Sequence, residues 1–136
     1  MLIGVDLLSE EPIYQQIRSQ IVHGIATGEL VAGDSLPSVR SLAGDLGVNM
    51  HTVNKAYALL RDEGYVVMKR RSGAVVADRA AKVSPETRRR TNDRLSQALR
   101  RLALEHKAQG GSMEEFVAMA QAEATQVYGA RGKASR

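Results

Sequence analysis

The sequence of 136 residues contains no cysteine and no tryptophan, and it has a single phenylalanine. Without cysteine, neither a disulfide framework nor a metal site with thiolate ligands can form. No run of 18 apolar residues is present, which excludes a transmembrane helix. The first twelve residues carry acidic side chains and no basic cluster, unlike a signal peptide. These absences predict a cytoplasmic protein with no membrane partner.

Motifs that carry catalysis or hold a cofactor are also missing. The sequence has no nucleophile elbow, no phosphate-binding loop and no paired-carboxylate signature. His23 and His106 fall on expected helices without a second ligand at metal spacing, and His51 has no acidic partner nearby in the sequence. We therefore expect no catalytic residue, no cofactor and no bound metal in a protein that is not an enzyme.

Charge is distributed unevenly along the chain. The net charge is +4 and the pI is about 9.7, which fits a nucleic-acid partner. Residues 1–78 hold seven Lys/Arg and nine Asp/Glu, a balance of −2, whereas residues 79–136 hold twelve and six, a balance of +6. Any affinity of the first half for DNA must therefore come from the local placement of a few cations.

Three helices are expected in the first half. Isoleucine recurs every fourth residue and marks an amphipathic helix over residues 12–27. After a turn-rich stretch, a short helix over residues 38–46 ends at Gly47, where a left-handed residue commonly stops a helix. Asn49 is a good N-cap for a third helix, expected over residues 49–63.

The third helix has two faces of opposite character. The apolar residues that should hold it on the other two helices recur at helical spacing and are Val53, Ala56, Tyr57 and Leu60. The other face carries His51, Asn54 and Lys55, at spacing i, i+3 and i+4. A polar face of this kind is usually just solvated, but on a recognition helix it contacts base edges in the major groove.

A basic hairpin follows the third helix. The β-branched runs "YVVM" and "AVVA" flank the turn "KRRSG" and predict two paired strands. Two helices joined by a tight turn and followed by a hairpin make a winged helix-turn-helix, so the expected fold class is mainly α with a small β-hairpin. Arg70 and Arg71 at the wing tip can contact phosphates or the minor groove, or simply solubilise the turn.

The polar stretch "DRAAKVSPETRRR" marks the expected boundary between a DNA-binding domain, 1–78, and a short helical domain, 79–130. A disordered tail is expected over residues 131–136. Two apolar stripes separated by "AQGGS" predict two helices in the second domain, too short to bury both stripes without a second copy. The candidate residues of this dimer interface are Leu95, Leu99, Leu102, Phe116 and Ala120.

Residues 11–77 closely resemble the DNA-binding domain of GntR-type bacterial transcription regulators. The segments that carry the resemblance are "PIYQQI", "GELVAGDSLPSVRSLA" and "VNMHTVNKAYALLRDEG". The short C-terminal part resembles the YtrA-type subfamily, whose members lack the large effector-binding domain of other branches. Members of this subfamily are often associated with transport operons, and their two helices are expected to dimerise.

The resemblance implies DNA contacts at matching positions. Arg40 falls where the family places a DNA-contacting arginine, Ser38 where a phosphate contact is expected, and Gly73 at the wing glycine that lets the backbone approach the minor groove. Asn54 matches a base-facing position that is often basic elsewhere in the family. The complete candidate set is Ser38, Arg40, Asn49, His51, Thr52, Asn54, Lys55, Arg70, Arg71 and Gly73.

Three positions depart from the family pattern. Met50 stands where the YtrA-type pattern usually has a proline. Arg71 takes the place of the first wing glycine, and Val75 takes that of an aromatic residue. These changes favour a stiffer and more electrostatic wing, so an operator sequence cannot be transferred from relatives.

The expected function is that of a homodimeric, sequence-specific regulator of transcription that binds a palindromic operator in duplex DNA. A repressor of a transporter operon fits the subfamily best. The alternative is a sensor that binds an effector, not identified by the sequence, at the dimer or interdomain interface. A winged-helix module for protein interaction would show no salt-dependent DNA binding, and the chain is far too short for the aminotransferase-like domain of some relatives.

Overall fold

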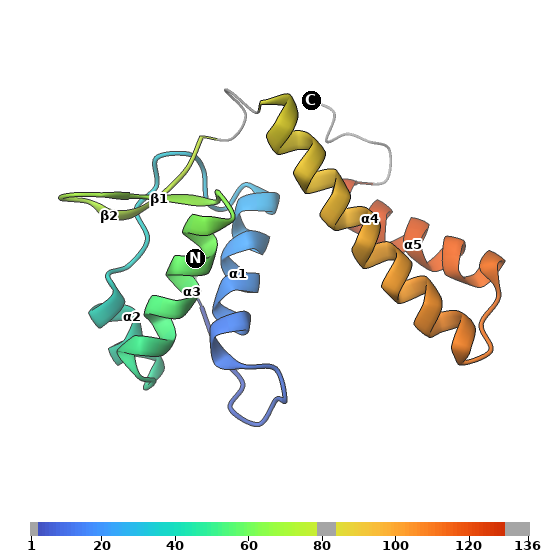
Figure 1. Cartoon of the computed structure of the whole chain (residues 1–136). Helices are drawn as coiled ribbons and strands as arrows, with labels where there is room; N and C mark the ends of the chain where they lie inside the picture. The colour runs from blue at the N-terminus through green and yellow to red at the C-terminus, as the bar shows by residue number, and fades with distance from the viewer. Residues whose placement is uncertain (1–2, 79–83, 130–136) are drawn as a thin grey trace. The chain divides into compact units, whose positions relative to one another are not determined.

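The computed structural model describes residues 3–78 and 84–129. The expected disordered tail over residues 131–136 lies outside the described residues, as do residues 79–83 around the expected domain boundary. The chain divides into two compact units, one ending at Lys82 and one beginning at Val83. The first unit contains three helices and a hairpin, and the second contains two helices (Figure 1).

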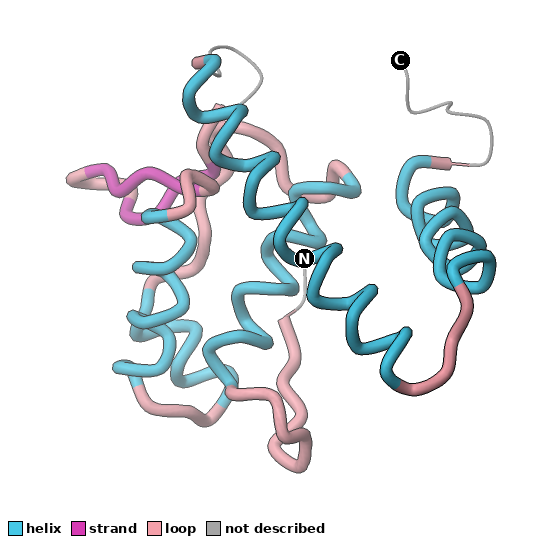
Figure 2. The backbone as a smooth tube through the Cα atoms, turned by 45° about the vertical axis from the view of Figure 1, so that its right-hand side comes forward, coloured by secondary structure: helices cyan, strands magenta, loops and turns pink. Residues whose placement is uncertain are grey.

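The described elements are mainly helical, with one two-stranded antiparallel sheet, and the expected fold class is confirmed. Figure 2 colours the chain by these elements. In chain order they are α1 (Ile13–Thr27), α2 (Val39–Leu46), α3 (Met50–Asp62), β1 (Val66–Lys69), β2 (Gly73–Val76), α4 (Pro85–Ala108) and α5 (Met113–Tyr128).

The core of the first unit lies where α1 and α3 pack side by side, with α2 and the hairpin against α3 (Figure 1). The four residues predicted to form the inner face of α3 are all buried, at 3% exposure or less. From α1 they meet Ile17 and Ile21, and from β1 they meet Val66. Burial of these side chains fixes the rotation of α3, so its polar face points to solvent.

The turn between α2 and α3 is as tight as the sequence predicts. Gly47 adopts the left-handed conformation, with φ of +70°, which a residue with a side chain rarely takes. The N–H of Val48 donates a hydrogen bond to the carbonyl oxygen of Ala43 at 3.0 Å, and this bond closes the end of α2. The turn thereby delivers the chain directly to Asn49, the N-cap of α3.

The hairpin forms a ladder with the segment that precedes α2. Lys69 pairs with Gly73 at the wing end of the hairpin, and Val66 pairs with Val76 at its base. On the other edge of β2, the N–H of Leu36 donates to the carbonyl oxygen of Ala74 at 2.9 Å. Leu36 precedes Pro37, a sequence context that predicts extended backbone at Leu36. This pairing ties the start of α2 to the wing.

A glutamine pair on α1 holds the N-terminal segment, which sequence analysis did not predict. Gln16 is buried, and its amide oxygen accepts a hydrogen bond from the N–H of Asp6 at 2.8 Å. Its amide nitrogen donates to the carbonyl oxygens of Asp6 at 3.1 Å and Glu11 at 2.8 Å. One turn later, Gln20 exchanges hydrogen bonds with the backbone of Gly4. All the polar atoms of the buried Gln16 amide group are thereby engaged.

The second unit is a pair of helices with well-defined ends. The first helix begins at Pro85, inside the polar stretch that sequence analysis took as a boundary, because Ser84 caps it and proline suits its first turn. In α5, Ser112 and Glu115 form a reciprocal capping box. Between the helices, a Cβ on Gly111 would meet the His106 ring at 2.0 Å, so any other residue there would force this ring to move.

Candidate nucleic-acid interface

The N-terminus of α3 is capped as the sequence predicts. The side-chain oxygen of Asn49 accepts a hydrogen bond from the N–H of His51 at 2.7 Å. This leaves the Asn49 amide nitrogen as a donor for another group. His51 and Asn54 lie exposed on the polar face, and Met50, the first residue of the helix, is also exposed. The first turn of α3 therefore presents an exposed imidazole ring and a flexible methionine to a partner.

The N-terminus of α2 is organised in the same way. Ser38 Oγ accepts a hydrogen bond from the N–H of Ser41 at 3.0 Å and keeps its own hydroxyl hydrogen for a further acceptor. Arg40, the second residue of α2, is exposed. The Tyr57 hydroxyl donates to the carbonyl oxygen of Pro37 at 2.7 Å, and burial raises the pKa of Tyr57 to about 12. This bond fixes the start of α2 relative to α3.

The wing carries exposed cations beside the start of α2. Arg70 and Arg71 lie in the turn between β1 and β2, and both are exposed. Gly73 has a φ of +72°, and a Cβ placed there would meet no other atom within 4 Å. Glycine is therefore favoured by its backbone conformation, and the space above it is open. A hollow of about 240 Å³ brings Arg71 and Gly73 together with Ser38.

Lys55 differs from the other candidates because a neighbouring helix holds it. Its ammonium group lies 4.1 Å from the centre of the Tyr14 ring, in the first turn of α1. The lysine side chain is nevertheless exposed. Tyr14 is partly buried and packs against the core of the first unit.

The ten candidate residues lie at the starts of α2 and α3, one turn further along α3, and in the wing. Nine are exposed and Thr52 is partly buried. Within residues 3–78, none of the four cations among them is in an ion pair, whereas Arg18 and Arg61 are each paired with a carboxylate. These unpaired cations are Arg40, Lys55, Arg70 and Arg71. They offer positive charge despite the slightly acidic balance of this half of the chain.

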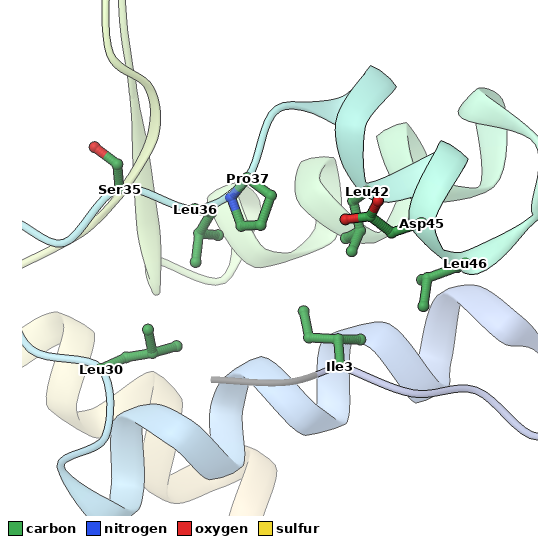
Figure 3. A pocket seen from close by; sticks show the side chains of 8 residues that line it. All are labelled: Ile3, Leu30, Ser35, Leu36, Pro37, Leu42, Asp45 and Leu46. Atoms are coloured by element: carbon green, nitrogen blue, oxygen red, sulfur yellow. The ribbon is translucent and has the colours of Figure 1, made fainter.

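A second hollow, of about 740 Å³, shares Leu36 and Pro37 with the hollow beside the wing (Figure 3). Its walls are mostly apolar and come from the N-terminal segment, the connection before α2, and α2 itself. Figure 3 shows Leu42, Asp45 and Leu46 on α2 above Ile3. Asp45 has no ion-pair partner among the described residues.

The α4–α5 unit exposes the residues predicted for the dimer interface. In the described residues 84–129, no side chain of α4 or α5 is buried. Leu95, Leu99 and Leu102 are between 42% and 57% exposed. Phe116 is partly buried against His106, with ring centres 5.8 Å apart, and Ala120 is exposed. Among residues 84–129, this unit therefore has exposed apolar stripes and no buried core.

Sequence analysis did not predict the contacts by which two tyrosines support this surface. Tyr57 was assigned to the core, which is correct, but its hydroxyl bond to Pro37 was not foreseen. Tyr14 was noted only within the motif "PIYQQI" and not paired with Lys55. A sequence signal existed only for Tyr57, because a buried tyrosine usually finds a hydrogen-bond partner.

Residues 13–76 match the family described as bacterial regulatory proteins, gntR family. Among solved structures, YtrA from Sulfolobus acidocaldarius, a GntR-family transcription factor, is 46% identical, with a TM-score of 0.56. The alignment covers 73% of this chain and 98% of that one. The chain belongs to the GntR family.

Two further GntR comparisons bear on the DNA-binding half. The HTH-type transcriptional repressor YtrA of Bacillus subtilis is 39% identical over 58% of this chain and 61% of its own length. The DNA-binding domain of AraR, in complex with operator ORX1, is 29% identical with a TM-score of 0.50, covering 56% of this chain and 96% of that domain. The GntR relatives are transcription regulators and not enzymes, as the sequence predicts.

The match to curated GntR relatives is partial, since this chain spans about 60% of the length of the first of them. In residues 3–78 and 84–129, no helix is both long and apolar enough to cross a bilayer. The same residues contain no group of three or more His, Asp or Glu side chains arranged to hold a metal ion.

Proposed function

We propose that this GntR-family chain regulates transcription by binding a specific sequence in duplex DNA. The observation that carries the proposal is the exposure of polar helix starts in α2 and α3 together with unpaired cations, with the start of α2 and the wing lining one hollow. An α-helix fits the major groove, and its N-terminal residues then contact base edges. The operator complex of the AraR domain supports the same use of this fold.

Each candidate residue then has a proposed role. His51 and Asn54 face base edges, and Arg40 contacts a base or a phosphate at the start of α2. Asn can pair bidentately with adenine, which makes Asn54 the proposed main reader of sequence. The remaining candidates, which position the protein on the backbone or in the minor groove, are Ser38, Asn49, Thr52, Lys55, Arg70, Arg71 and Gly73.

We further propose that the chain acts as a homodimer of the YtrA-type subfamily. The DNA-binding domain would span residues 1–78 and the dimerisation domain residues 79–130. The apolar stripes of α4 and α5 are exposed, and a second copy would cover Leu95, Leu99 and Leu102 together with Phe116 and Ala120. A two-fold dimer places two recognition helices on a palindromic operator.

Repression is the proposed outcome of binding, because the similar Bacillus subtilis protein is named a transcriptional repressor. A transporter operon is the proposed target, following the subfamily. A regulator that binds an operator acts where the DNA lies, so the proposed site of action is the cytoplasm.

The test starts with selection of binding sequences from random duplexes by the full chain. Fluorescence anisotropy with the selected duplex and a scrambled one, over a series of salt concentrations, then measures specificity. Tight binding to the selected duplex near physiological salt supports the proposal. No enriched sequence, or equal and salt-sensitive binding to both duplexes, would contradict sequence-specific regulation.

One observation favours the alternative of an effector-responsive sensor. The hollow beside α2 has about 740 Å³, within the range of small-molecule sites, and Asp45 supplies a carboxylate at its wall (Figure 3). This hollow lies inside the DNA-binding unit and differs from the dimer or interdomain site expected from the sequence. A panel of small apolar amines should raise the melting temperature of the wild type but not of Asp45→Asn. No shift with any amine would leave this alternative without support.

A further inference from the structure

The contact between Lys55 and Tyr14 joins the recognition helix to α1. The ammonium nitrogen lies 4.1 Å from the ring centre, inside the distance at which a cation is attracted by an aromatic face. Tyr14 is anchored by its packing against the core, whereas Lys55 is exposed. The ring is therefore the fixed partner, and it limits where the flexible lysine side chain can place its charge.

This contact holds the cation without neutralising it. A carboxylate partner, such as Glu63 for Arg18, compensates the charge and occupies a donor. An aromatic ring carries no net charge, and at least part of the ammonium N–H donors stay available. Lys55 has no ion pair within residues 3–78 and 84–129. The result is a positioned positive charge at the surface that is free to meet an anion.

The surroundings of the contact also favour an anion. Tyr14 lies in the first turn of α1, whose N-terminus carries a partial positive charge. This turn contains no acidic residue, and no side chain caps it. The exposed Glu10 and Glu11 precede the helix, but neither forms an ion pair with Lys55. A cation held beside a positive helix end is better stabilised by an incoming phosphate than by the protein alone.

The position of Lys55 on α3 indicates which part of DNA it meets. An α-helix of 10–12 Å diameter fills a major groove about 12 Å wide, so residues on its flanks face the phosphates at the rim. Lys55 lies on the flank of α3 toward α1, since it contacts Tyr14. We propose that Tyr14 is a positioning residue of the DNA interface, whose ring holds the Lys55 ammonium group against one backbone phosphate. This inference rests on the proposed function.

The test is a double-mutant cycle in the full chain with Tyr14→Leu, Lys55→Gln and the double variant. Binding to the selected and the scrambled duplex is measured by anisotropy over a series of salt concentrations. Lys55→Gln should weaken binding to both duplexes alike and lower the salt slope by about 0.9 for each protomer bound. Tyr14→Leu alone should also lower the DNA affinity and the salt slope. In the Lys55→Gln background, Tyr14→Leu should change neither quantity further. Tyr14→Phe keeps the ring and should bind like the wild type.

Lys107→Gln is the matched charge control, since it removes one cation from the α4–α5 unit and should leave the slope unchanged. Two outcomes would overturn the inference: Tyr14→Leu weakening DNA binding equally with and without Lys55→Gln, or Tyr14→Phe binding as poorly as Tyr14→Leu. A wild type that prefers the selected duplex while showing no such coupling would refute the role of Tyr14 alone. A wild type without preference would refute the proposed function and this inference together.

A second measurement does not depend on the leucine variant being folded. In the wild type, the Tyr14 ring current should move the ε-methylene protons of Lys55 upfield of their random-coil position in NMR spectra. Unshifted protons would show that the lysine is not held, and would overturn the inference.

Discussion

The hydroxyl of Tyr57 donates a hydrogen bond to the carbonyl oxygen of Pro37 across 2.7 Å, linking the middle of α3 to the residue before the N-cap of α2. The Tyr57 side chain is almost fully buried, and with Pro37 it lines the hollow beside the wing. The bond sets the two helix N-termini, which carry half of the candidate DNA contacts, at a fixed separation.

Removal of this hydroxyl should destabilise the protein modestly. Tyr57→Phe keeps the ring in the core but leaves the Pro37 carbonyl oxygen without this donor. We expect a loss of about 1 kcal/mol in the free energy of unfolding, measured by urea denaturation. An unchanged midpoint would mean that the bond contributes nothing to stability.

The same residue should make stability sensitive to alkaline pH. Burial raises the pKa of Tyr57 to about 12 in the folded state, above its ordinary value of 10. The unfolded chain therefore loses this proton first, and the stabilisation present below pH 10 should disappear as pH rises toward 12. The stability difference between the wild type and Tyr57→Phe should shrink over this range. A constant difference across the range would contradict the linkage.

The glutamine pair on α1 should contribute unequally to stability. Gln16 is buried and makes three hydrogen bonds to the N-terminal segment, whereas the Gln20 bonds to Gly4 are exposed. Gln16→Ala should cost about 2 kcal/mol in the free energy of unfolding, and Gln20→Ala clearly less. Equal losses in thermal or urea unfolding would argue against a structural clasp at Gln16.

Arg40 should matter for DNA affinity. It is exposed at the start of α2 and has no ion pair among the described residues, so its charge is available to DNA. Arg40→Ala should weaken binding to the selected duplex by about 1–3 kcal/mol in anisotropy titrations. Arg61→Ala, at the other end of α3, serves as the control and should change affinity little. If both variants bind like the wild type, Arg40 is not part of the interface.

Asn54 should determine sequence preference more than affinity. Its exposed amide lies on the face of α3 opposite the core, one turn after His51. An amide that pairs with a base discriminates between bases, whereas non-specific affinity comes from phosphate contacts. Selection from random duplexes with Asn54→Ala should give a relaxed consensus at one position of each half-site. An identical consensus would remove Asn54 from base recognition.

The apolar stripe of α4 should mediate self-association. Leu99 lies on the predicted stripe and is 42% exposed, whereas Leu104, 59% exposed, lies on another side of the helix. Leu99→Glu should convert a dimer to a monomer in sedimentation at micromolar concentration, and Leu104→Glu should not. A wild-type chain that already sediments as a monomer would refute the proposed dimer.

The sequence determined the helices, the hairpin and their buried faces, because these depend on local information. The i, i+3, i+4 spacing of Val53, Ala56 and Tyr57, and glycine at position 47, are physical requirements of a helix face and of a left-handed turn. The cap at Asn49 followed from a side chain that reaches only two residues along the chain.

Only the tertiary structure decided the contacts between elements distant in sequence. The Tyr14–Lys55 contact joins residues 41 positions apart, and the Tyr57–Pro37 bond joins residues 20 positions apart. The partner that each of these side chains contacts depends on how the helices pack. The exact start of α4 at Pro85 is not marked by periodicity, because a solvated, charged helix has no apolar stripe in its first turns. The apolar periodicity of the sequence predicts which face of a helix is buried, but the packing of the helices determines which residues that face contacts.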